Sequence, residues 1–171
     1  MSEAIMKVLG ISANSRLLAL AIIHDNELKD FNVHLFKERW SDQKVKRIIG
    51  QIKRCIKTHS ITKIALTIPY AHYQNKETKK LIIQIKTFCD KKNCSVETYS
   101  PQAFHCLFEE ARAKKKALMK SLVERYPELL FPYRKEITNK RRYYHKLFEA
   151  VAAGTLLARD LKLKNLAQND M

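Results

Sequence analysis

Two apolar segments joined by a short turn decide how this chain folds: residues 7–12 read KVLGIS and residues 16–24 read RLLALAIIH. The first is a nearly continuous apolar run, which is typical of a central strand buried on both faces. Ala13, Asn14 and Ser15, which separate the two segments, have the composition of a turn. Because the second apolar run follows this turn directly, we predict a second strand that pairs with the first.

The residues after this pair continue the pattern of a meander. Asp25 and Asn26 both tolerate left-handed backbone and predict a tight connection. Phe31, Val33 and Leu35 then alternate with polar neighbours, as a half-solvated strand requires. The sequence therefore predicts three antiparallel strands at the start of the chain.

The spacing of apolar residues then changes, and helices alternate with strands. Such alternation implies parallel crossover connections. We expect an α/β fold with a five-stranded mixed sheet, three antiparallel strands followed by two parallel ones, flanked by helices. The predicted elements are a helix over residues 45–56 after an N-cap at Ser41, a strand over 63–68, a helix over 81–89, a strand over 95–99, a helix from Ser100-Pro101, and a last helix over 147–163.

The segment between the last two helices is strongly basic. Residues 112–146 hold twelve Lys or Arg against three Glu, within a chain whose net charge is +16. A helix is predicted to reach Tyr126, and Pro127 and Pro132 are predicted to break the chain. We expect one domain over residues 1–171, with this basic helical or irregular insertion at about residues 109–145.

This charge favours a nucleic-acid partner, because cations neutralise phosphates and the tyrosines and phenylalanine between them can stack on unpaired bases. A solvated helix, an acidic protein partner and an anionic membrane surface are the alternatives. A second basic stretch, residues 44–57, occupies the polar face of the first predicted helix. The candidate nucleic-acid-binding residues are Arg16, Lys114, Lys115, Lys116, Lys120, Arg134, Lys135, Lys140, Arg141 and Arg142.

The cysteines predict reduced thiols in a cytoplasmic protein, because they form no C-x-x-C pair and no zinc-finger grouping. No membrane span is predicted, since no stretch approaches 18 uncharged apolar residues. No secretory signal is predicted, since the first residues lack a basic region followed by a long apolar run. His105 and Cys106 are adjacent on a predicted helix and point in different directions, so they do not predict a Cys–His catalytic pair. The four cysteines are Cys55, Cys89, Cys94 and Cys106.

The order of elements resembles the ribonuclease H-like fold, and two motifs are similar to those of the RuvC-type Holliday junction resolvases. LGISANSR at residues 9–16 looks like their opening, an apolar strand that continues as Gly-Ile-Asp-Pro-Gly-Ser-Arg. FEAVAAG at residues 148–154 looks like the acidic, Ala-rich helix that closes their active site. The topological resemblance covers nearly the whole chain, and the motifs cover about fifteen residues. It implies binding to branched DNA in recombination or repair, and a homodimer, since the junction is two-fold symmetric.

The resemblance also implies two divalent metal ions held by four carboxylates. The aligned positions in this chain are Ser12, Thr67, Glu149 and Ala152, so Glu149 alone supplies a carboxylate. Mg²⁺ prefers anionic oxygen ligands, and a neutral hydroxyl brings no charge. We therefore expect a nucleic-acid-binding protein with a degenerate nuclease site, no metal site and no cofactor.

Three alternatives stay open. The first is an active, Mg²⁺-dependent endonuclease that uses Glu97 or Asp25 as acids from a shifted alignment. Such an enzyme could also hold a metal ion with Glu149 and His145, which are four residues apart on one helix face, although we prefer the interpretation that His145 is simply exposed beside Glu149. The loop after Gly10 could be the phosphate loop of an actin-like ATPase, although such loops need more than one glycine. The third alternative is a scaffold or protein-interaction module without nucleic acid.

Overall fold

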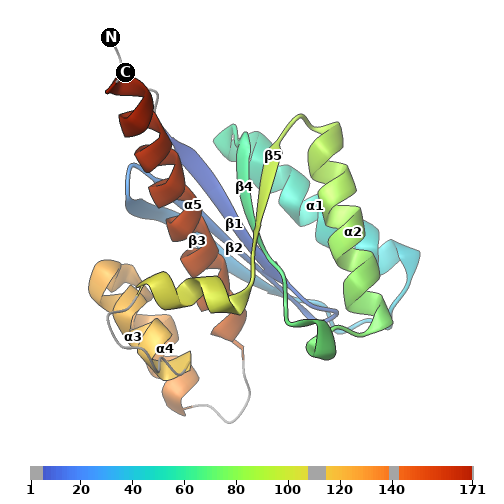
Figure 1. Ribbon diagram of the computed structural model, residues 1–171. Helices are drawn as coiled ribbons and strands as arrows, with labels where there is room; N and C mark the ends of the chain where they lie inside the picture. Colours follow the sequence, from blue (N-terminus) through green and yellow to red (C-terminus); the bar gives the residue numbers. More distant parts are fainter. Residues whose placement is uncertain (1–5, 108–114, 139–142, 171) are drawn as a thin grey trace.

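The computed structural model describes residues 6–107, 115–138 and 143–170. A five-stranded mixed sheet in the order β3-β2-β1-β4-β5 lies between two layers of helices (Figure 1). The first three strands are antiparallel, and β4 and β5 run parallel to β1. This confirms the predicted α/β class and the predicted sheet. The strands are β1 (Lys7–Ala13), β2 (Leu17–His24), β3 (Glu27–Leu35), β4 (Lys63–Thr67) and β5 (Ser95–Tyr99).

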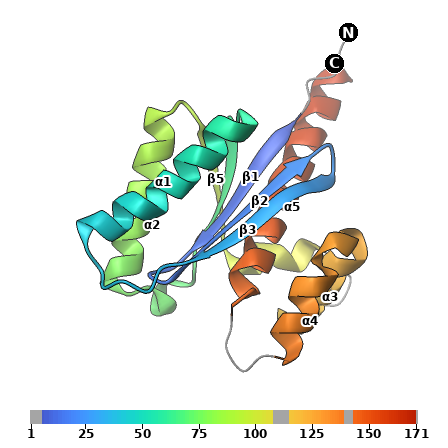
Figure 2. The ribbon, with the colours of Figure 1, turned by 180° about the vertical axis from the view of Figure 1, so that it is seen from behind.

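Two helices cover one face of the sheet, and the helical elements that follow β5 lie on the other face (Figures 1 and 2). Among the described residues, no helix is both long enough and apolar enough to cross a membrane. One face of the sheet is covered by α1 (Asp42–His59) and α2 (Lys76–Lys91). The opposite face carries η2 (Pro101–Leu107), α3 (Lys115–Arg125), η3 (Pro127–Leu129), α4 (Leu130–Thr138) and α5 (His145–Asn169). The short η1 (Ala71–Tyr73) follows β4.

The central strand β1 is buried on both faces, as its apolar run predicts. Leu9 and Ile11 belong to the core beneath α1 and α2, whereas Val8 belongs to the core beneath α5. The alternation of side chains along a strand therefore directs Gly10 and Ser12 toward α5. The residues that face α5 at the carboxyl end of β1 are thus fixed by the periodicity of one short strand.

The local signals at the turn and at the first helix are also confirmed. Asp25 and Asn26 have φ values of 51° and 65°, the left-handed conformation that these residue types tolerate. The hydroxyl of Ser41 accepts a hydrogen bond of 3.1 Å from the backbone N–H of Lys44 and caps α1.

Three expectations about helices are corrected. The segment after Ser100 is the 3-10 helix η2, and α5 continues to Asn169, six residues beyond its predicted end at 163. The prediction that Pro132 breaks the chain is wrong, because Pro132 lies in the first turn of α4. The first-turn N–H groups of a helix have no intrahelical acceptor, so proline removes nothing there.

Gly154 lies where α5 packs against β1 and β2. A Cβ atom on Gly154 would lie 3.1 Å from Cγ1 of Ile23 and 3.6 Å from Cα of Gly10. We expect Gly154→Leu to overpack this contact and to lower the free energy of unfolding by about 1–3 kcal/mol. Urea denaturation measures the change, and an unaltered midpoint would show that a leucine side chain fits between α5 and the sheet at this position.

Candidate functional site

The carboxyl ends of β1 and β4 bring two hydroxyl groups beneath the start of α5. Ile11 pairs with Leu66 in parallel register, so Ser12 and Thr67 are the next residues of the two strands. Both side chains are buried. The hydroxyl of Thr67 donates a hydrogen bond of 3.4 Å to the backbone carbonyl of Glu149. Residues 82 positions apart in the sequence therefore meet at one edge of the sheet.

The carboxylate of Glu149 has two partners. Its Oε2 atom accepts a hydrogen bond of 2.8 Å from the hydroxyl of Ser12. The same oxygen lies 3.2 Å from Nζ of Lys146, one turn earlier on α5. Only 9% of the Lys146 side chain and 17% of the Glu149 side chain are exposed. Ser12, Thr67, Lys146 and Glu149 form the cluster that we call the Glu149 centre.

Charged groups from three helices surround His145, at the start of α5. Burial lowers the pKa of His145, with Lys146 and Lys115 lowering it further and with Glu149 and Glu136 opposing them. Its Nδ1 atom is buried and has no hydrogen-bond partner within the described residues. The expectation of an exposed histidine is therefore wrong, because elements far away in the sequence pack around the start of α5.

The lowered pKa of His145 predicts a fold that weakens in acid. As the pH falls, the imidazole of His145 binds a proton at a higher pH in the unfolded chain than in the folded chain. The free energy of unfolding is therefore unaffected by this group above the ordinary histidine pKa of about 6.5, and it decreases as the pH falls from there toward the pKa of the folded state. We expect His145→Gln to reduce the loss of melting temperature between about pH 7 and pH 5. His72→Gln, at an exposed position, serves as the control. Equal losses in both variants and in the wild type would refute this assignment.

The basic segment packs against the start of α5. The carboxylate of Glu136 in α4 accepts hydrogen bonds from the backbone N–H groups of Tyr143 (3.2 Å) and Tyr144 (2.8 Å), which ties α4 to the start of α5. Arg16, in the turn after β1, is exposed at the same end of the sheet. The described and exposed cations of the segment, which we call the α3–α4 cations, are Lys115, Lys116, Lys120, Arg125, Arg134 and Lys135.

The other cations of the two basic stretches divide into three groups: buried side chains, side chains on α1, and residues outside the described ranges. Lys146 is buried in the Glu149 centre, so it does not belong to the basic surface. Lys44 is also buried, and its ammonium donates to the backbone carbonyl of Glu38 at 2.8 Å. The stretch over 44–57 belongs to α1 and lies on the opposite side of the sheet from α3 and α4 (Figure 2). Lys114, Lys140, Arg141 and Arg142 lie outside the described residues.

The aromatic residues of the basic segment have different roles. The hydroxyl of Tyr126 lies 2.9 Å from Oγ1 of Thr155 in the core. The hydroxyl of Tyr143 donates to the backbone carbonyl of Val33 at 3.3 Å. Phe131, by contrast, is 62% exposed. Base stacking by the whole aromatic set is therefore not compatible with the fold, because tertiary contacts engage part of it.

A second group of aromatic rings follows β4. The ring centroids of Tyr70 and His72 lie 5.7 Å apart, and those of His72 and Tyr73 lie 4.1 Å apart. Tyr73 is 72% exposed. This loop begins just after Thr67, so its rings lie at the same end of the sheet as the Glu149 centre.

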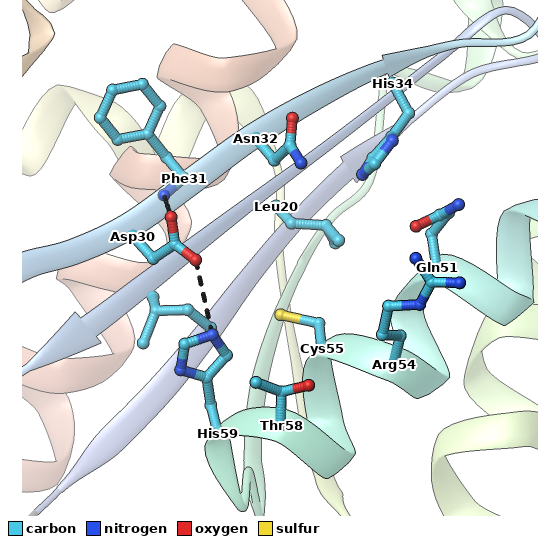
Figure 3. Close-up of a pocket in the computed structure, with 11 residues that line it drawn as sticks. Leu20, Asp30, Phe31, Asn32, His34, Gln51, Arg54, Cys55, Thr58 and His59 are labelled. Atoms are coloured by element: carbon cyan, nitrogen blue, oxygen red, sulfur yellow. Dashed lines mark hydrogen bonds and ion pairs between the residues drawn. The ribbon is translucent and has the colours of Figure 1, made fainter.

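A cavity of about 240 Å³ lies between β3 and α1, on the face opposite α5 (Figure 3). Its lining includes Asp30 and His59, whose Oδ2 and Nε2 atoms are 3.5 Å apart. Burial, with a smaller effect from the charge of Asp30, raises the pKa of the Cys55 thiol to about 11. Burial and then the charge of Arg54 lower the pKa of His34. The thiol is protonated at neutral pH, so this cavity does not provide an activated Cys–His pair.

Comparison with known proteins identifies the fold. No family model and no curated protein matches the sequence. A structure of Thermus thermophilus RuvC is 16% identical in sequence with a TM-score of 0.71, and the alignment covers 93% of this chain and 97% of that one. A second structure of the same protein, in complex with a Holliday junction substrate, is also 16% identical with a TM-score of 0.70, over 92% of this chain and 96% of that one. Fowlpox virus resolvase in complex with Holliday junction DNA is 16% identical with a TM-score of 0.58, over 91% of this chain and 99% of that one. The chain has the RuvC-type ribonuclease H-like fold.

The residues at the Glu149 centre of this RuvC-type fold do not fit a pair of divalent metal ions. Ser12 and Thr67 offer neutral hydroxyls, and the carboxylate of Glu149 is already paired with the ammonium of Lys146. Ala152 is fully buried in the apolar core beneath α5. Within the described residues, no three His, Cys, Asp or Glu side chains form a group that could hold a metal ion. Hard divalent ions need anionic oxygen ligands, and this centre supplies one.

The acids of the shifted alignments lie elsewhere in the RuvC-type fold. Asp25 is in the turn between β2 and β3 and lines a cavity with Lys162 and Leu166, near the C-terminal end of α5. Glu97 is exposed on the edge strand β5, where it pairs with Ala65 of β4. Neither carboxylate has a hydrogen bond or ion pair with the Glu149 centre among the described contacts.

Sequence reasoning missed two features of this end of the fold. The basic segment includes Lys146, although its spacing of three residues before Glu149 places both on one helix face. The predicted strand over 63–68 leaves out the aromatic residues Tyr70, His72 and Tyr73 that follow it. In both cases the signal was present in the sequence, but its meaning depended on what lay across the fold.

Proposed function

We propose that this protein binds branched or structured DNA through the α3–α4 cations and does not cleave it by a metal-dependent reaction. The observation that carries the proposal is the Glu149 centre itself. The single carboxylate lies where β1, β4 and α5 meet, and its partners are a serine hydroxyl and a lysine ammonium. A two-metal mechanism needs several carboxylates at one place to hold the ions and activate water.

The comparisons and the charge support the nucleic-acid part of the proposal. Two of the solved structures with the same fold are complexes with Holliday junction DNA. This chain carries a net charge of +16, and the exposed α3–α4 cations adjoin the start of α5. Lysine and arginine side chains neutralise phosphates and release counterions, which supplies affinity without reading sequence.

The exposed rings near the Glu149 centre suggest how a branch point is distinguished from a plain duplex. Unpaired bases stack on aromatic side chains, whereas paired bases inside a duplex are not available for stacking. His72 and Tyr73 supply exposed rings after β4 beside the half-buried ring of Tyr70, and Arg16 supplies a cation after β1. The proposal includes two copies of the chain on one two-fold symmetric junction, which a measured stoichiometry of two chains per junction would support.

One experiment tests binding and cleavage together. The wild type and Glu149→Gln are incubated with labelled four-way junction, duplex and single strand, with Mg²⁺ or Mn²⁺, and both complexes and products are measured. We expect binding that prefers the junction and no cleavage by either protein. Cleavage by the wild type that Glu149→Gln abolishes would overturn the proposal in favour of an active endonuclease. No binding to any of the three at low salt would overturn it in favour of a scaffold.

A further inference from the structure

The position of Lys146 accounts for how the buried carboxylate of Glu149 is neutralised. We propose that the ammonium of Lys146 is a built-in counter-cation that takes the place of a divalent metal ion at the carboxylate of Glu149. This deepens the proposed function and rests on it, because it states what holds the centre together in a binding protein without metal. The contact is short, at 3.2 Å between Nζ and Oε2, and both side chains are largely buried.

Burial requires some cation at this place. A carboxylate removed from water is costly unless it is paired and hydrogen-bonded. Ser12 supplies the hydrogen bond at 2.8 Å, and Lys146 supplies the charge. The spacing of three residues on α5 places the ammonium and the carboxylate on one helix face. The centre is therefore neutral without an ion from solution.

The same arrangement opposes a metal ion. A divalent ion bound to Glu149 would lie within a few ångströms of the Lys146 ammonium, and like charges at that separation repel strongly in a buried site. Lys115 adds to the positive potential, since its charge also acts on His145. Restored carboxylates would therefore bind metal well only if the charge of Lys146 were removed as well.

The test measures Mn²⁺ affinity by calorimetry in a background where acids are restored. Ser12→Asp/Thr67→Glu is compared with the same variant that also carries Lys146→Gln, and with one that carries Lys162→Gln. Lys162 is an exposed lysine of the same helix, so it controls for net charge. We expect Lys146→Gln to tighten Mn²⁺ binding by about tenfold or more and Lys162→Gln to leave it unchanged. Equal affinities in all three variants would overturn the proposal.

A second measurement applies if the restored acids prevent folding. The wild type, Lys146→Met and Lys146→Met/Glu149→Gln are melted with and without millimolar Mn²⁺. We expect Mn²⁺ to raise the melting temperature of Lys146→Met only, because that variant alone has an unpaired carboxylate at the centre. No rise in Lys146→Met, or an equal rise in all three, would refute the replacement of metal by lysine. These readouts do not involve DNA, so failure of the proposed function would be seen separately in the binding assay.

Discussion

Replacement of Gly10 by alanine is expected to destabilise the fold strongly, because the added methyl group has no space. A Cβ atom at Gly10 would lie 2.0 Å from the backbone carbonyl oxygen of Ala150 and 3.2 Å from the backbone nitrogen of Gly154. These obstacles belong to the backbone of α5, so no side-chain rotation relieves them. Since α5 would have to move away from the sheet, we expect Gly10→Ala to lower the free energy of unfolding by about 3 kcal/mol or more.

Gly50 provides a matched control for the same chemical change. It lies on α1 and is exposed, and a Cβ atom there would have nothing within 4 Å. Gly50→Ala is therefore expected to raise stability by up to about 1 kcal/mol, the difference in helix propensity. Urea denaturation of both variants gives the two values. Similar midpoints for Gly10→Ala and Gly50→Ala would show that α5 does not pack on β1 as described.

Reversal of three α3 charges is expected to have the largest effect on binding. Lys115, Lys116 and Lys120 are all exposed on α3, where they can contact phosphates. If each contacts one phosphate, their combined change to Glu should reduce affinity for a four-way junction by about 10²–10³-fold at about 0.1 M salt, and should reduce the log–log salt slope by about three units. The loss should be similar for every DNA sequence, because phosphate contacts carry no base information.

The control places the same change of charge on the other face. Lys79, Lys80 and Lys86 are exposed on α2, across the sheet from α3 (Figure 1). Their combined change to Glu alters the net charge equally but removes no contact from the proposed surface, so it should weaken binding much less. Fluorescence anisotropy over a series of salt concentrations measures both variants. Equal losses would mean that net charge, and not the surface of α3 and α4, determines the affinity.

The sequence by itself determined the local elements and their order. The run from Lys7 to Ser12 predicted a buried strand, and Asp25-Asn26 predicted a tight turn, because those signals arise within a few neighbouring residues. The resemblance of residues 9–16 and 148–154 placed Ser12 and Glu149 at positions equivalent to metal ligands, and the fourth predicted strand placed Thr67 at another. The hydrogen bonds of Ser12 and Thr67 to Glu149 show that these three residues do meet.

The tertiary structure alone decided what each charge does. Lys146 and Lys116 look alike in a basic stretch, but one is buried against Glu149 and the other is exposed on α3. Tyr126 and Phe131 look alike as interleaved aromatics, but one lies in the core and the other in solvent. These differences depend on which helix faces are buried when distant parts of the chain pack together, as Ser12 does against Glu149, 137 residues later. Periodicity describes only a residue's own element, so it places Lys146 and Glu149 on one face of α5 but could not predict that this face is buried against β1 and β4.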